Sequence, residues 1–126
     1  MPARSTTIYS FEGRLISYDE DGVQAVFEGP ARAIRCAVAI TESAGRLEVG
    51  VKTGVHTGEC DVSGDIYSGY AVQLAERIAL EAPEGEVIVS RTVKDLVAGS
   101  GLRFSECGIK TFEGIEGEWR LFEVVH

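Results

Sequence analysis

Three adjacent carboxylates, Asp19, Glu20 and Asp21, stand immediately before Gly22, between two short apolar segments. Carboxylate oxygens are the ligands that Mg²⁺ and Mn²⁺ prefer, so this cluster could bind a divalent cation weakly. The alternative is a simple turn, because an Asp-Gly pair between two strand-like segments favours a tight hairpin. Acidic residues in a turn without fixed geometry are more often only solvated, and on the residues alone the turn is the favoured interpretation.

Gln73, Glu76 and Arg77 fall on the polar side of a segment with helical periodicity, away from the apolar stripe Ala71, Leu74, Ala75 and Ile78. Gln73 and Arg77 are four residues apart, which places them one turn apart on the same face of the helix. On the residues alone, Arg77 is an exposed helix arginine that pairs with Glu76 or Glu81.

The remaining residues with reactive side chains indicate structure more than chemistry. His56 lies in a strand-like segment and is best interpreted as a packed histidine. The three cysteines have no metal-ligand spacing, and their odd number indicates reduced thiols in a cytoplasmic protein: Cys36, Cys60 and Cys107. The sequence contains no phosphate loop, zinc spacing or nucleophile elbow.

Length and charge narrow the class of protein further. The 126 residues fit one domain, with residues 1–7 expected to be flexible. Twelve basic and twenty acidic side chains give a net charge of −8, which repels polyanions, so we expect neither nucleic acid nor a membrane surface as a partner. No segment is apolar enough over a sufficient length to span a membrane.

Apolar periodicity and turn residues predict the elements that must position these side chains. The order is strand, strand, helix, strand, strand, helix, strand, helix, strand, strand. The predicted bounds are Leu15–Tyr18, Val23–Phe27, a helix opening at Gly29-Pro30, Leu47–Val55, Thr57–Val62, Tyr70–Ala82, Val87–Val89, a helix capped by Ser90 and closed by Gly99, Leu102–Phe104 and Trp119–Val125. This order predicts an α+β fold with a mostly antiparallel sheet and helices on one face, similar to a ferredoxin-like core without its opening β-α unit.

Five segments in this order resemble the catalytic domain of class III nucleotidyl cyclases, the adenylate and guanylate cyclases. They are Asp21-Gly22 with Phe27 and Gly29–Ala33, then Gly54–Glu59, Val72–Ile78, Gly85–Ser90 and Gly114–Trp119. The resemblance runs from about Phe11 to the end of the chain. It implies a ferredoxin-like dimer that converts ATP or GTP into a cyclic nucleotide and pyrophosphate. That reaction uses two divalent metals, Mg²⁺ or Mn²⁺, on two carboxylates.

The resemblance also assigns site positions. The second metal-binding aspartate corresponds to Asp21, and the base-reading lysine corresponds to Ser17, which has no charge. The base-specifying acid falls on Ile66; Asp65 is adjacent, but a shift of one residue in a strand changes the face.

In the helix, the transition-state asparagine corresponds to Gln73 and the transition-state arginine to Arg77. The chain contains no asparagine at all. The first metal-binding aspartate would belong to an opening strand-helix unit ahead of Phe11. We expect that unit to be missing, or else encoded upstream of a misassigned start.

These departures predict that the chain is catalytically inactive, or nearly so, as a homodimer. The favoured hypothesis is a dimerisation or regulatory module that forms a homodimer, or a heterodimer with another cyclase-like domain. Mg²⁺ or Mn²⁺ is expected only if nucleotide binding is retained. The alternative is an active half in a heterodimer, in which a complete partner supplies the metal-binding acids and this chain lends Arg77. An exposed sheet edge would be covered by a partner, by a domain swap, or by Thr7–Phe11 as a replacement strand.

Overall fold

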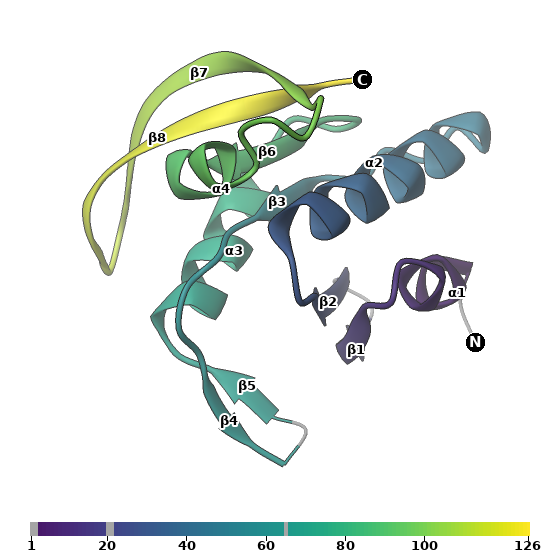
Figure 1. The fold of residues 1–126 in the computed structure, drawn as a ribbon, viewed down its shortest axis with the longest axis horizontal. Helices are drawn as coiled ribbons and strands as arrows, with labels where there is room; N and C mark the ends of the chain where they lie inside the picture. Colours follow the sequence, from purple (N-terminus) through teal and green to yellow (C-terminus); the bar gives the residue numbers. More distant parts are fainter. Residues whose placement is uncertain (1–2, 20–21, 65) are drawn as a thin grey trace.

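The computed structural model describes residues 3–19, 22–64 and 66–126. The elements in chain order are α1 (Ala3–Ser10), β1 (Arg14–Asp19), β2 (Gly22–Val26), α2 (Pro30–Arg46), β3 (Thr53–Val55), β4 (Asp61–Ser63), β5 (Ile66–Ser68), α3 (Tyr70–Glu81), β6 (Val87–Ser90), α4 (Arg91–Leu96), β7 (Arg103–Phe112) and β8 (Ile115–Val125). Figure 1 shows a four-stranded sheet with the β1–β2 and β4–β5 hairpins lying apart from it.

The four-stranded sheet has the order β3-β6-β8-β7. β3 runs parallel to β6, whereas β8 is antiparallel to both β6 and β7. Every residue of the central strand β6 is buried, as its continuous apolar sequence predicts for a strand covered on both faces. The mixed α+β class with a mostly antiparallel sheet is therefore confirmed.

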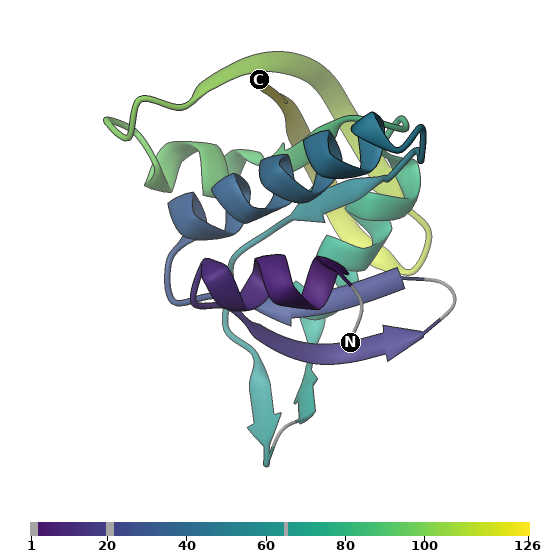
Figure 2. The same ribbon diagram turned by 90° about the vertical axis from the view of Figure 1, so that its right-hand side faces the viewer.

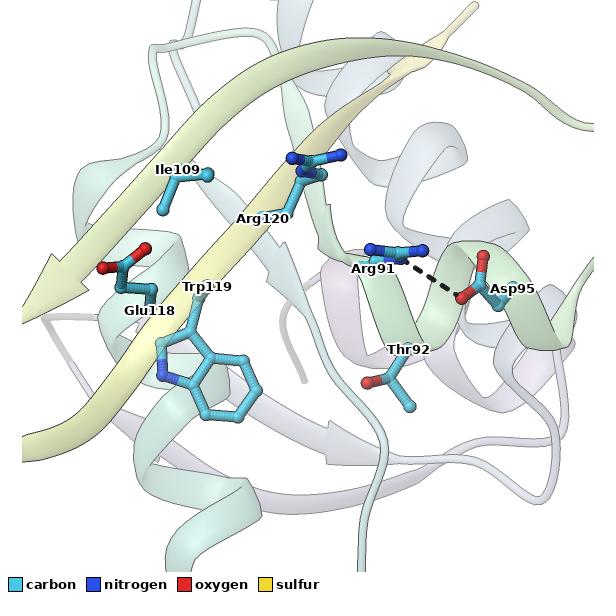
Figure 3. Close-up of a pocket in the computed structure, with 7 residues that line it drawn as sticks. All are labelled: Arg91, Thr92, Asp95, Ile109, Glu118, Trp119 and Arg120. Carbon is cyan, nitrogen blue, oxygen red and sulfur yellow. Dashed lines mark ion pairs between the residues drawn. The ribbon is translucent and has the colours of Figure 1, made fainter.

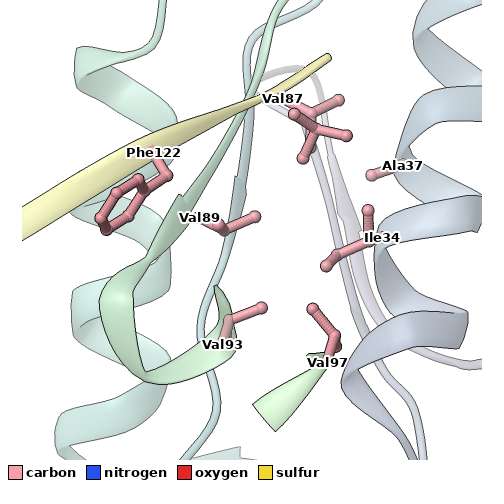
Figure 4. Packing of buried hydrophobic residues seen from close by; sticks show 8 residues of the cluster. Ile34, Ala37, Val87, Val89, Val93, Val97 and Phe122 are labelled. Carbon is pink, nitrogen blue, oxygen red and sulfur yellow. The ribbon is translucent and has the colours of Figure 1, made fainter. Parts of the chain in front are cut away.

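Two apolar clusters lie on opposite faces of this sheet, because successive side chains of a strand point to opposite sides. The α2-side cluster contains Val87 and Val89 of β6 and is shown in Figure 4; its members are Ile34, Ala37, Val87, Val89, Val93, Val97, Phe122 and Val124. The α3-side cluster contains Ile88 of β6; its members are Leu74, Ile78, Ala82, Ile88, Phe112, Ile115 and Leu121. Helices thus cover both faces, and our prediction of helices on one face only does not hold.

The termini of α2, α3 and α4 follow from residues in their sequences. Pro30 starts α2 directly after the extended Gly29, since its fixed φ suits the first helical turn. α3 ends at Glu81 because Pro83 disfavours a helical conformation at the preceding residue, and Ala82 is indeed extended. The side-chain oxygen of Ser90 caps α4 by accepting a hydrogen bond from the backbone N–H of Val93.

The predicted β1–β2 hairpin is confirmed by its register. Leu15 pairs with Ala25 and Tyr18 with Val23, with an irregularity between Leu15 and Ser17. The hairpin forms a two-stranded sheet of its own. Asp21 lies outside the described residues.

The segment Leu47–Val55 is a strand only at its end, Thr53–Val55. Leu47 and Val49 instead close the end of α2, where their backbone N–H groups donate to the carbonyl oxygen of Ala44. The predicted strand Thr57–Val62 is likewise reduced to β4, and β5 was not predicted. Short polar strands carry too little hydrophobic alternation to be found from sequence.

The start of the chain differs most from expectation. Thr7–Phe11 is not a replacement strand, because Ala3–Ser10 forms the helix α1. The expected flexibility of residues 1–7 stays a prediction. Ile8 is only 2% exposed, and α1 packs against α2 and β1. Burial of the Ile8 side chain helps to anchor the helix, and the polar composition of the segment does not reveal it. In the described part of the chain, no helix combines the length and apolarity that crossing a bilayer requires.

Candidate functional site

α3 presents Gln73 on the side away from its buried residues and Arg77 at the flank of its buried stripe. Ala71, Leu74 and Ile78 face the sheet, so the helical period turns Gln73 outward, where it is exposed. Arg77 is half-buried. The predicted juxtaposition of an amide and a guanidinium one turn apart is therefore present.

The guanidinium of Arg77 binds the tip of the β7–β8 hairpin, which we define as Phe112–Glu116. Its Nη1 donates to the carbonyl oxygen of Glu113 at 2.6 Å, and its Cζ lies 5.8 Å from the centre of the Phe112 ring. Neither expected partner, Glu76 or Glu81, forms an ion pair with it within the described residues. The sequence gives no signal for this contact, because the acceptor is a backbone carbonyl far along the chain.

The β1–β2 hairpin lies against α3. The Nε2 of Gln24 donates to Oε2 of Glu76 at 3.2 Å, and Gln24 is the cross-strand partner of Ser17. This one side-chain contact links the β1–β2 hairpin, which contains Ser17, to α3. Gln24 carries no sequence signal for a functional role, yet its side chain links the two elements.

Ile66 opens β5 and pairs with Ser63 across the β4–β5 hairpin. Asp65, the possible substitute for an acid at this position, lies outside the described residues. Figures 1 and 2 show this hairpin projecting from the body of the molecule. All three residues of β4 are exposed, and Arg14 Nη1 lies 3.5 Å from the hydroxyl of Tyr67.

His56 is a packed residue, as the sequence indicated. Its Nδ1 lies 2.7 Å from Oγ of Ser90, and its ring meets that of Trp119 edge-on at 5.7 Å. Burial lowers the pKa of His56, because a low dielectric disfavours the charged imidazolium. This arrangement fits a neutral imidazole whose Nδ1 accepts a hydrogen bond from the Ser90 hydroxyl.

The three cysteines are free thiols. Burial raises the pKa of Cys36 to about 11. The pKa of Cys107 is raised first by burial and then by the negative charges of Glu123 and Glu86. Since the thiolate is the nucleophile, these environments do not activate Cys36 or Cys107.

A cavity of ≈ 370 Å³ lies between α4 and the β7–β8 hairpin. It is lined by Arg91, Thr92, Asp95, Ile109, Glu118, Trp119 and Arg120, and Figure 3 shows how these side chains lie. The two arginines are offset by two carboxylates, and Arg91 pairs with Asp95 at 3.6 Å. The lining therefore offers no excess positive charge for a phosphate, and it contains none of the predicted site residues.

The described residues do not fit a metal centre. Among them, no three His, Cys, Asp or Glu side chains come together in a group that could hold an ion. Asp21, the one candidate ligand, lies outside them. We therefore derive no step through Mg²⁺ or Mn²⁺.

Comparison with solved structures identifies the architecture. An adenylate/guanylate cyclase/hydrolase from Silicibacter pomeroyi superposes with a TM-score of 0.84 at 22% identity, over 98% of this chain and 79% of that one. The guanylate cyclase domain of RhGC from Catenaria anguillulae, solved in complex with GTP, gives a TM-score of 0.83 at 15% identity, over 97% and 77%. The fold is that of a class III adenylate/guanylate cyclase domain. The adenylyl cyclase CyaB from P. aeruginosa agrees, with a TM-score of 0.79 at 18% identity, over 98% and 76%.

Sequence comparison adds relatives but not a function. No family model matches the chain. An uncharacterized protein of Mycobacterium tuberculosis is 27% identical over 97 residues, which are 75% of this chain and 26% of that protein. A second uncharacterized protein of that organism is 28% identical over 82 residues, or 65% and 28%. The chain with the cyclase fold thus spans about a quarter of the length of the curated relatives it matches.

Proposed function

We propose that this chain is a cyclase-fold module that associates with a second cyclase-like domain and turns over little or no nucleotide itself. The observation that carries the proposal is the face of α3. It offers Gln73, whose amide is one methylene farther out than that of an asparagine, and Arg77, whose guanidinium is engaged by the chain's own Glu113 carbonyl at 2.6 Å. In this interpretation the chain is a cytoplasmic pseudoenzyme.

The positions expected to recognise a base support the same conclusion. Ser17 brings a hydroxyl and no charge, and Ile66 brings no hydrogen-bonding group. Removing one preorganised donor from an active site typically lowers the rate about 100- to 1,000-fold. Several such losses in one site are not additive, but together they leave little catalysis.

The exposed β4–β5 hairpin favours association. An isolated two-stranded hairpin is marginally stable in water, yet this one projects with Val62 58% exposed. Domains with a similar fold have been solved both as dimers and as monomers. One from Blastocladiella emersonii is a non-canonical dimer, and adenylate cyclases of Trypanosoma brucei were solved in a monomeric state. We propose that the partner of this chain is a second copy or another cyclase-like domain, which covers the hairpin.

Light scattering of the purified chain at micromolar concentration tests the association. We expect a dimer or a larger species, and a clean monomer across that range would contradict a homodimer.

Mixing the chain with complete cyclase domains from the same organism distinguishes an active heterodimer from an inactive module. Cyclic nucleotide formation is then compared with that of each protein alone. Our proposal predicts that the mixture is no more active than the partner. A gain that Arg77→Ala abolishes would establish the heterodimer alternative instead.

A further inference from the structure

We infer that Arg77 and Tyr70 are structural ties that fasten the tip of the β7–β8 hairpin, Phe112–Glu116, to α3. Arg77 Nη1 donates to the carbonyl oxygen of Glu113 at 2.6 Å, and the Tyr70 hydroxyl donates to the carbonyl oxygen of Glu116 at 2.8 Å. Figures 1 and 2 both show this tip beside α3. The inference goes beyond the proposed function, since it holds whether or not the chain turns over a nucleotide.

The spacing along α3 makes this pair of contacts possible. Tyr70 and Arg77 are seven residues apart, which places both side chains on one stripe of the helix, two turns apart. The tip runs past this stripe, so that one end of it meets Tyr70 and the other meets Arg77. Gln73 stands between them in the helix and has no side-chain hydrogen bond within the described part of the chain.

Two side chains of the tip, Phe112 and Ile115, are buried in the α3-side cluster, and the rest of the tip depends on polar contacts. Phe112 and Ile115 form the last pair of the ladder, and the intervening turn needs Gly114 at a φ of 80°, a conformation that favours glycine. Outside this apolar pair the tip is exposed. Hydrogen bonds from α3 to the carbonyl oxygens of Glu113 and Glu116 therefore stabilise the tip.

The Arg77 contact is the stronger of the two, because a hydrogen bond from a charged donor contributes about twice as much as a neutral one. The guanidinium also lies over the edge of the α3-side cluster, 5.8 Å from the Phe112 ring. At Glu116 the indole Nε1 of Trp119 adds a third donor at 3.3 Å. This longer contact lies within the hairpin itself, so Tyr70 remains the tie to α3.

Hydrogen–deuterium exchange of the full chain, read by mass spectrometry, tests the inference without any activity measurement. Arg77→Ala should raise the exchange rate of the backbone amides in residues 112–117 about tenfold. Tyr70→Phe, which removes only the hydroxyl, should raise it about fivefold in the same peptide. The matched control is Arg46→Ala, which removes an exposed arginine from the end of α2 and should leave the tip unchanged.

Exchange in β6 serves as the internal reference, since a general loss of stability would accelerate both segments. Faster exchange of the tip relative to β6 in both variants supports the ties. Tip exchange equal to that of the wild type in both Arg77→Ala and Tyr70→Phe would overturn the inference. Cyclase activity in the unmodified chain would refute the proposed function and leave this result unaffected.

Discussion

At the scale of single residues, His56 joins the end of β3 to the start of α4 through its 2.7 Å contact with Ser90. Its pKa is lowered from the ordinary value of 6.5 by burial. The unfolded chain therefore binds a proton at this residue at a higher pH than the folded chain. By linkage, stability contributed by neutral His56 is fully present above pH 6.5 and is lost as the pH falls below it.

We accordingly predict that the free energy of unfolding decreases between pH 6.5 and pH 5 more steeply in the wild type than in His56→Gln. The comparison between the two proteins at each pH isolates the contribution of His56. Urea unfolding at several pH values measures it. Parallel pH profiles for the two proteins would show that His56 is not held neutral by its surroundings.

At Gly54 of β3 the backbone of α3 closely approaches the sheet. A Cβ at this position would meet the backbone N of Ala79 and, at 2.8 Å, the carbonyl oxygen of Ala75. A helix backbone cannot move aside as a flexible side chain can. We predict that Gly54→Ala lowers the free energy of unfolding by about 3 kcal/mol or more.

Gly45→Ala is the matched control for Gly54→Ala in the same urea titration. Gly45 lies in α2, and a Cβ there would have no neighbour within 4 Å, so this change should be neutral or stabilise the chain by up to about 1 kcal/mol. Equal effects of the two substitutions would mean that β3 and α3 are not packed as described.

At the scale of elements, the β4–β5 hairpin should carry much of the association. Val62→Asp places a charge on its exposed surface, so folding stability should change by no more than about 0.5 kcal/mol, while burial of that charge at an interface would be costly. We predict that sedimentation equilibrium shows a dissociation constant raised about tenfold or more. Leu47→Asp is the control, because Leu47 is 75% exposed at the end of α2. If both variants associate like the wild type, the hairpin is not the interface.

Elements with strong periodicity or clear termini could be predicted from the sequence. α2 and α3 were found from their apolar stripes, and β6 from its continuous apolar run. β5 and most of β7 could not be found, because exposed strands such as Ser105–Thr111 are defined by pairing with β8 and not by hydrophobic alternation. α1 was missed because its sequence is mostly polar, and the burial of Ile8 cannot be recognised from so short a segment.

The candidate site was predictable to the extent that it depends on local spacing. Gln73 and Arg77 share a helix face as their four-residue separation requires. Arg77 and Tyr70 donate hydrogen bonds to backbone carbonyls of the β7–β8 tip. A pattern of side chains cannot predict these contacts, because every residue has a backbone carbonyl. The Gln24–Glu76 contact depends in the same way on how a separate hairpin packs against α3.

At the scale of the whole molecule, the cyclase fold is compatible with nucleotide binding, whereas the net charge of −8 disfavours it. One protein with this fold, the guanylate cyclase domain from Catenaria anguillulae, has been solved in complex with GTP. The acidity of this chain gives a polyphosphate no long-range attraction. Under our proposal, a domain that keeps this architecture while Arg77 is engaged by its own chain serves to bind a protein partner.

The most direct test of this account is cyclic nucleotide formation by the purified chain alone. The chain is incubated with Mn²⁺ and ATP, and separately with Mn²⁺ and GTP, at concentrations where light scattering shows an associated species. A complete cyclase domain serves as the positive control. We predict that cyclic AMP and cyclic GMP stay at the level of a blank without protein. Formation of either product above that blank, in proportion to the amount of chain added, would contradict the account.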